Sequence, residues 1–113
     1  MSTIFSKIIN RDIEAKIIYE DNDVLAFEDI QPQAPIHILI IPKIEIPTLN
    51  DIDKDNIDVI SKMFLAAKNL AKNLDISENG YRLVINCNND GGQSVYHIHM
   101  HLLGGRTMNW PPG

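Results

Sequence analysis

Three histidines alternate with apolar residues near the C-terminal end of the chain, in the stretch from His97 to Leu103. A period of two is that of a β-strand, in which successive side chains point to opposite faces of the sheet. His97, His99 and His101 are therefore expected on one face, at intervals of about 6.6 Å. The apolar residues between them are expected to pack against helices on the other face. This stretch therefore predicts a strand with one polar face and one apolar face.

The remaining strands and helices follow from β-branched runs and helical periodicity. We expect strands at Lys16–Glu20, Val24–Asp29, Ile36–Pro42, Tyr81–Cys87 and Tyr96–Leu103, with the first two forming a hairpin. A short helix is expected over residues 2–10, capped by Ser2 or Thr3, with Ile4, Phe5, Ile8 and Ile9 on one side. These elements predict a single α+β domain over residues 1–113, with a largely antiparallel sheet.

A longer helix is expected from about Asp53, as its N-cap, to Leu74. Apolar residues recur there at spacings of three and four, which predicts one buried face. That face comprises Ile57, Ile60, Phe64, Ala67, Leu70, Ala71 and Leu74.

Composition excludes several classes of protein. The net charge is −5 and no run of Lys or Arg stands out, which argues against binding to duplex nucleic acid. The longest apolar run, Ile36–Pro42, is too short to span a membrane and contains His37. A lone cysteine, Cys87, cannot form an intramolecular disulfide and suits a reducing compartment. We therefore expect a cytoplasmic protein, with the nucleus as a second location in a eukaryotic cell.

The three histidines admit three interpretations. They are a solvated surface row, or they bind zinc together with His37 or Cys87, or they catalyse nucleophilic attack at phosphorus. A neutral imidazole is nucleophilic near its ordinary pKa of about 6.5, and neighbouring imidazoles can hydrogen-bond phosphate oxygens.

The loop before the histidines favours the third interpretation. Gly91 and Gly92 offer backbone amides to an anion, and the polar residues Gln93 and Ser94 follow directly. We expect this loop to hold a phosphate, so that neither a metal nor a cofactor is required.

Five segments in the same order resemble the histidine triad (HIT) superfamily, and in particular its nucleotide-binding Hint branch. They are Thr3–Ile9, Glu28–Pro35, Asp90–Tyr96, the triad His97–His101 and the ending Leu103–Gly113. The resemblance implies a HIT-like fold with a five-stranded antiparallel sheet, one long helix and one short helix. It also implies a homodimer across which the sheet extends, with the tail, residues 104–113, at the interface.

The resemblance also implies roles for individual residues. His99 is the expected nucleophile, His101 contacts the phosphoryl oxygens, and His37 and His97 support them. Ser94 lies near the leaving group. Asn86, Gly92 and Gln93 are expected on the phosphate, Asp29 on the ribose hydroxyls, and Phe5, Ile8, Phe27, Ile30 and Leu39 around the purine.

The activity implied is hydrolysis of purine nucleoside phosphoramidates, such as AMP–amine conjugates, through a nucleotidyl-histidine intermediate. The alternatives are a dinucleoside polyphosphate hydrolase, a nucleotidyl transferase, or a nucleotide-binding scaffold protein. Glu28, Glu45 and Cys87 depart from residues common in the branch, which bears on the rim of the site and on the preferred leaving group.

Overall fold

The computed structural model describes residues 2–113, and its framework is a five-stranded antiparallel sheet in the order β1-β2-β3-β5-β4. The strands are β1 (Ile17–Glu20), β2 (Val24–Glu28), β3 (Ile36–Pro42), β4 (Tyr81–Val84) and β5 (Met100–Gly104). The helices are α1 (Ile4–Ile9), η1 (Leu49–Asp51, a 3₁₀ turn), α2 (Ile57–Asn73) and α3 (Asn88–Gly91). The predicted α+β class, hairpin and antiparallel sheet are confirmed, and β3 has the predicted limits. The short turns η1 and α3 were not predicted.

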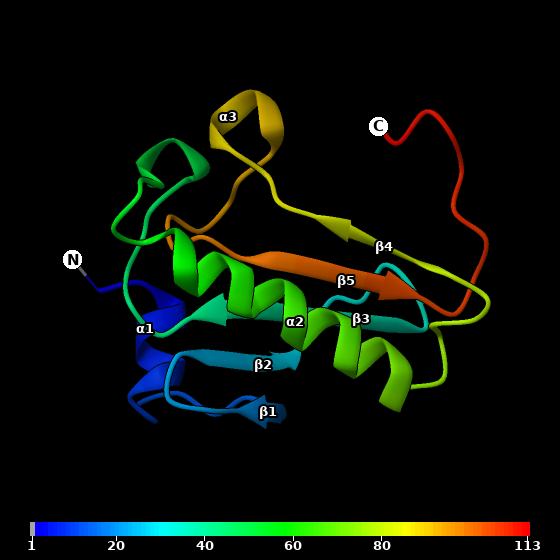
Figure 1. Ribbon diagram of the computed structural model, residues 1–113, viewed down its shortest axis with the longest axis horizontal. Helices are drawn as coiled ribbons and strands as arrows, with labels where there is room; N and C mark the ends of the chain where they lie inside the picture. Colours follow the sequence, from blue (N-terminus) through cyan, green and yellow to red (C-terminus); the bar gives the residue numbers. More distant parts are fainter. Residues whose placement is uncertain (1) are drawn as a thin grey trace.

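The long helix α2 lies across one face of the sheet (Figure 1). Alternate residues of the central strands meet it, including Ile38, Ile40, Met100 and Leu102, which are all buried. The apolar residues between the histidines do pack on this side, as the alternation predicts.

The start and the phase of α2 differ from the prediction. Asn56, not Asp53, precedes the first helical residue, and Asp53 instead caps the turn before the helix by accepting from the amides of Asp55 and Asn56. Ile57 and Phe64, expected on the buried face, are exposed. Met63 and Ala66 are buried, so the face that meets the sheet is rotated toward them.

The opposite face of the sheet is covered in part by α1. Thr3 caps this helix, because its side-chain oxygen accepts from the amide of Ser6. In return, the amide of Thr3 donates to the hydroxyl oxygen of Ser6. The cap positions Phe5 and Ile8 toward the sheet. They join Leu25, Phe27, Leu39 and Ile41 in a second apolar cluster.

Strand β5 begins at Met100, four residues later than predicted, and β4 ends at Val84. The ladder between β3 and β5 stops at the pair Ile40–Met100. Two residues further along β3 stands Pro42, which has no N–H to continue the ladder. The amide of Ile98 donates instead to the carbonyl of Ile46, 2.6 Å away, so the segment before β5 turns toward residues 42–46.

Candidate active site

The four histidines gather on the face of the sheet that α2 does not cover. The ring centroids of His99 and His101 are 5.1 Å apart, and those of His37 and His101 are 5.2 Å apart. Phe5 packs edge-on against His99 at 4.9 Å and against His97 at 6.1 Å. The prediction that the triad shares one face therefore holds, although His97 and His99 precede the strand itself.

Two backbone carbonyls fix the tautomers of His99 and His97. A carbonyl only accepts, so Nδ1 of His99 carries the proton in its 2.8 Å bond to the carbonyl of His97. Nε2 of His99 is then the nitrogen with a free lone pair. In the same way, Nε2 of His97 donates to the carbonyl of Pro42 at 2.8 Å, which leaves its Nδ1 unprotonated.

A backbone amide fixes the tautomers of the other two histidines, His37 and His101. The N–H of Gln33 donates to Nδ1 of His37 across 3.0 Å, so in the neutral ring the proton lies on Nε2. Nε2 of His37 is 2.9 Å from Nδ1 of His101 and donates to it. His101 must then carry its own proton on Nε2. The pair thus carries an N–H donor on His101, whose ring centroid lies 5.1 Å from that of His99.

Burial keeps the imidazoles neutral. It lowers the pKa of His37, His97 and His99 below the usual histidine value, and lowers the pKa of His101 to about 4, with help from the neighbouring His99 and His37. The carboxylate of Asp29, 3.5 Å from Nε2 of His37, acts in the opposite direction on the pKa of His37 without overcoming burial. At neutral pH the site therefore holds uncharged imidazoles, the form in which a histidine is a nucleophile.

Within residues 2–113, only Nδ1 of His97 is both fully buried and without a hydrogen-bond partner. Nε2 of His99 also has no partner, but it is not sealed from the surface. A nucleophilic nitrogen must be accessible from the surface to reach the phosphorus atom of a substrate.

Asp29, His37 and His101 each offer a ligand atom within 4.8 Å of the others, which is close enough for a metal ion. Zinc binds histidine through an unprotonated nitrogen. Nδ1 of His37 already accepts the Gln33 amide, so its Nε2 is protonated and cannot bind zinc unless that hydrogen bond breaks. The donor set therefore does not fit a zinc ion in this arrangement.

The loop that leads into the triad is held by its own hydrogen bonds. The side chain of Gln93 is buried, donates to the carbonyls of Pro47 and Val95, and accepts from the amide of Asn88. The amides of Gly92 and Gln93 donate to the carbonyls of Asn89 and Asn88. In this conformation the polar groups of the Gln93 side chain and the amides of Gly92 and Gln93 are hydrogen-bonded within the protein.

Asn86 and Ser94 differ from Gln93. Neither side chain has a hydrogen-bond partner among the residues that the structure describes, and Ser94 is exposed. Their polar atoms are available to a ligand.

The residues expected around a purine divide into two groups. Phe5, Ile8, Phe27 and Leu39 lie together in the apolar cluster, and Leu39 is the direct partner of His101 in the sheet. Ile30 is 93% exposed and lies outside that cluster. Sequence reasoning missed the backbone groups of Gln33, Pro42 and His97, because no residue type marks a carbonyl or amide that sets a tautomer.

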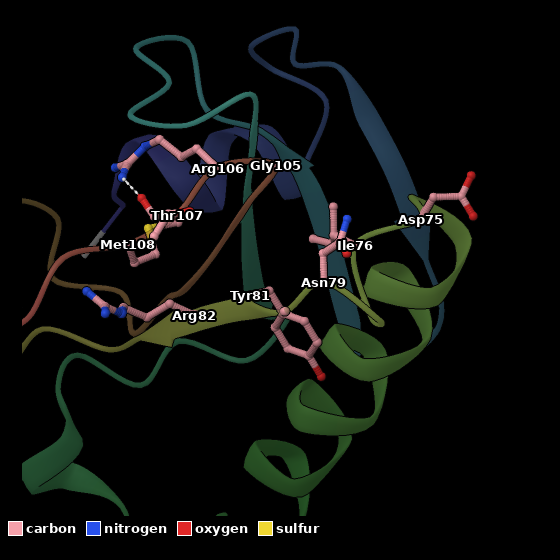
Figure 2. Close-up of a pocket in the computed structure, with 10 residues that line it drawn as sticks. Asp75, Ile76, Asn79, Tyr81, Arg82, Gly105, Arg106, Thr107 and Met108 are labelled. Atoms are coloured by element: carbon pink, nitrogen blue, oxygen red, sulfur yellow. Dashed lines mark hydrogen bonds between the residues drawn. The ribbon is translucent and has the colours of Figure 1, made fainter.

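A hollow of about 600 Å³ lies away from the histidines (Figure 2). It is bordered by the end of α2, the start of β4 and the first tail residues, among them Tyr81, Arg82 and Met108. None of the four histidines lines it. This hollow is therefore separate from the histidine cluster.

The HIT domain family model matches residues 10–108 of the chain. The chain belongs to the HIT domain family. It is 56% identical over 106 residues to the purine nucleoside phosphoramidase of Escherichia coli (strain K12), covering 94% of this chain and 89% of that one. It is 50% identical over 113 residues to the adenylylsulfatase HINT1 of Arabidopsis thaliana, covering 98% of this chain and 76% of that one.

Solved structures agree with this assignment. A HIT family hydrolase from Legionella pneumophila superposes with a TM-score of 0.97 at 53% identity, covering 99% of this chain and 100% of that one. The HIT-like sheet and helices expected from the sequence are therefore confirmed. No helix among residues 2–113 is long and apolar enough to cross a membrane.

Proposed function

We propose that this HIT protein hydrolyses purine nucleoside phosphoramidates, such as adenosine 5′-monophosphoramidate and other AMP–amine conjugates, through a nucleotidyl-histidine intermediate on His99. The observation that carries the proposal is the 2.8 Å bond from Nδ1 of His99 to the carbonyl of His97. It directs the lone pair to Nε2, in a ring that burial keeps neutral. The similarity to a purine nucleoside phosphoramidase of Escherichia coli and an adenylylsulfatase of Arabidopsis supports the substrate class.

The reaction takes two steps. Nε2 of His99 attacks phosphorus, the bond from phosphorus to the amine nitrogen breaks, and the amine nitrogen takes up a proton from solvent as it leaves. Water then attacks phosphorus, the bond to Nε2 breaks, the proton lost by the water passes to solvent, and AMP is released with a neutral His99. We expect the Nε2–H of His101 to donate to a phosphoryl oxygen in both steps, because Nδ1 of His101 accepts from His37.

Other residues of the proposed site bind the substrate. The free hydroxyl of Ser94 is suited to the leaving nitrogen, and the free amide of Asn86 to a phosphate oxygen. Gly92 and Gln93 shape the loop that carries Ser94. One oxygen of Asp29 accepts from the Gln31 amide at 2.8 Å, and the carboxylate keeps lone pairs for the ribose hydroxyls.

The apolar cluster supplies the proposed base site. Phe5, Ile8, Phe27 and Leu39 form its floor, next to His99 and His101. Ile30, which is exposed in the free chain, is a residue that a bound base would cover.

The test compares turnover of adenosine 5′-monophosphoramidate by the wild-type protein and by His99→Ala. Covalent catalysis predicts that the variant loses activity by about 10³-fold or more. Intact-mass analysis of the wild-type protein quenched during turnover should show an added AMP mass, absent from His99→Ala. Equal turnover by both proteins would exclude His99 as the nucleophile, and a wild-type protein without turnover would exclude the substrate class.

We also propose that the chain acts as a homodimer in the cytoplasm. Trp110 in the tail is 81% exposed, and Phe64 and Leu65 on α2 are 48% and 58% exposed, so a single chain leaves large apolar side chains uncovered. A partner chain that packs on α2 and on the tail, residues 104–113, would cover them. Light scattering should give twice the chain mass for the wild-type protein and the chain mass for Leu65→Glu.

A further inference from the structure

Near the start of the tail, Arg106 is hydrogen-bonded through its side chain to a distant loop. Nε and Nη2 of Arg106 donate to the carbonyl of Gln33 at 3.2 and 2.9 Å, and Nη1 donates to the carbonyl of Thr107 at 3.1 Å (Figure 2 shows the last of these). Two donors of one guanidinium on one oxygen fix its position as well as its distance. Within residues 2–113, no other group donates to the Gln33 carbonyl.

The preceding glycine lets the tail approach this loop. Gly105 has φ +89°, and a Cβ built on it would lie 2.9 Å from Cβ of Pro35. The tail and the loop of residues 31–35 therefore meet at van der Waals distance, and Arg106 fastens the contact.

Gln33 also makes the hydrogen bond that sets the tautomer of His37. Its carbonyl accepts from Arg106, and its own N–H donates to Nδ1 of His37 across 3.0 Å. The two groups are on the same residue, on either side of one Cα. A guanidinium that holds the carbonyl therefore also restricts the direction in which the N–H points.

We propose that Arg106 is a positioning residue for the His37–His101 pair. It holds the Gln33 amide on Nδ1 of His37, which keeps the His37 proton on Nε2 and the His101 proton on Nε2. This inference rests on the proposed function, because it assigns a purpose to the proton that His101 directs at a phosphoryl oxygen.

The chemistry of the pair shows what loss of Arg106 would do. Without the Gln33 amide, Nδ1 of His37 can carry the proton, and its Nε2 becomes an acceptor. The 2.9 Å bond then survives only if Nδ1 of His101 donates, which leaves Nε2 of His101 unprotonated. A lone pair would then face the phosphoryl oxygen in place of a hydrogen-bond donor.

The experiment reads the tautomers directly by ¹⁵N NMR of imidazole-labelled protein without substrate, with the four histidines assigned by single substitutions. In the wild-type protein, Nδ1 of His37 should have the shift of an unprotonated nitrogen and Nε2 that of a protonated one. Arg106→Gln, and Arg106→Lys, which keeps the charge but loses the two-pronged bond, should both move these shifts toward an average of the two tautomers. In both variants kcat for the phosphoramidate should fall about tenfold, since misplacing a catalytic group is costly.

Arg82→Ala is the matched control. Arg82 also holds the tail, donating to the carbonyl of Asn109 at 3.0 Å and lying 5.9 Å from the ring of Trp110, but it does not bond the 31–35 loop. Its substitution should leave the His37 shifts unchanged. Wild-type shifts for His37 in folded Arg106→Gln, or equal shift changes in Arg82→Ala, would overturn the inference. A wild-type protein without turnover would instead contradict the proposed function, while the NMR result would stand on its own.

Discussion

The two faces of the sheet are built from the same strands, but one is organised by packing of apolar side chains and the other by hydrogen bonds to histidines. The face under α2 is lined by apolar side chains such as Ile40, Met100 and Leu102, which are fully buried. The opposite face also has an apolar cluster, but next to it lie four histidines, three of which hydrogen-bond backbone atoms and the fourth the ring of His37. Burial in the first case stabilises the fold, whereas in the second it sets proton positions. Substitutions at neighbouring residues of β5 should therefore have different effects, on catalysis at one residue and on stability at the next.

His101→Phe tests the polar face. Removing the Nε2–H donor from the phosphoryl site should lower kcat by about 10²- to 10³-fold, the usual effect of losing one such donor. Because the aromatic ring keeps the packing against Leu39, the protein should remain folded. Steady-state kinetics with the phosphoramidate measures the effect, and a kcat within threefold of wild type would show that His101 does not contact the reacting group.

Met100→Ala, at the adjacent residue, tests the apolar face. Met100 is fully buried under α2, so truncation should lower the free energy of unfolding by about 2–5 kcal/mol. Urea denaturation measures this value. The kcat of the folded fraction should stay within a few-fold of wild type, and a catalytic loss as large as that of His101→Phe would contradict the separation of the two faces.

The apolar face was also the more predictable of the two. The alternation of Ile98, Met100 and Leu102 with the histidines, and the limits of β3, follow from side-chain type alone. The phase of α2 does not, because apolar residues stand on more than one side of this helix. The spacing of three and four placed Ile57 and Phe64 on the buried side, where Met63 and Ala66 lie instead.

On the polar face, sequence identified the side chains but not their proton positions. The roles of His99 and His101 came from the family resemblance, and no residue type signals that the Gln33 amide or the His97 carbonyl fixes a tautomer. The sequence also did not reveal that the Gln93 side chain hydrogen-bonds backbone groups of Pro47, Asn88 and Val95. Strand β5 begins later than predicted because Pro42 in β3 cannot continue the ladder between the two strands. The sequence of β5 alone does not reveal this, since it depends on the partner strand.

The free energy of unfolding should depend on pH through the histidine face. The pKa of His101 is lowered to about 4 in the folded protein, so its contribution to stability is present above the ordinary value of about 6.5 and is lost as the pH falls toward 4. Between pH 7.5 and 5.5 this one group should reduce the free energy of unfolding by about 1 kcal/mol. Urea titrations at the two pH values measure it, with His101→Phe as the comparison in which that part of the difference disappears. An identical pH difference in both proteins would show that the His101 pKa is not lowered.

The helix caps offer the smallest and most local contrast between the two faces. α1, on the histidine face, has only six residues and is capped by the reciprocal bonds of Thr3 and Ser6, whereas the 17-residue α2 has no side-chain bond at its N-cap. Thr3→Ala should therefore destabilise α1 by about 1 kcal/mol. The amides of Lys7 and Asn10, bonded within this helix, should exchange with solvent about fivefold faster, while those of α2 should not change.

The same substitution tests whether α1 supports His99. Phe5 packs on the His99 ring at 4.9 Å, so each opening of α1 removes one wall of the site. An opening that costs even 1 kcal/mol less remains rare in a folded protein, so kcat should stay close to wild type. Faster exchange throughout α2 would mean that the two faces unfold together, and a large fall in kcat would mean that Thr3 acts on the site through more than the cap.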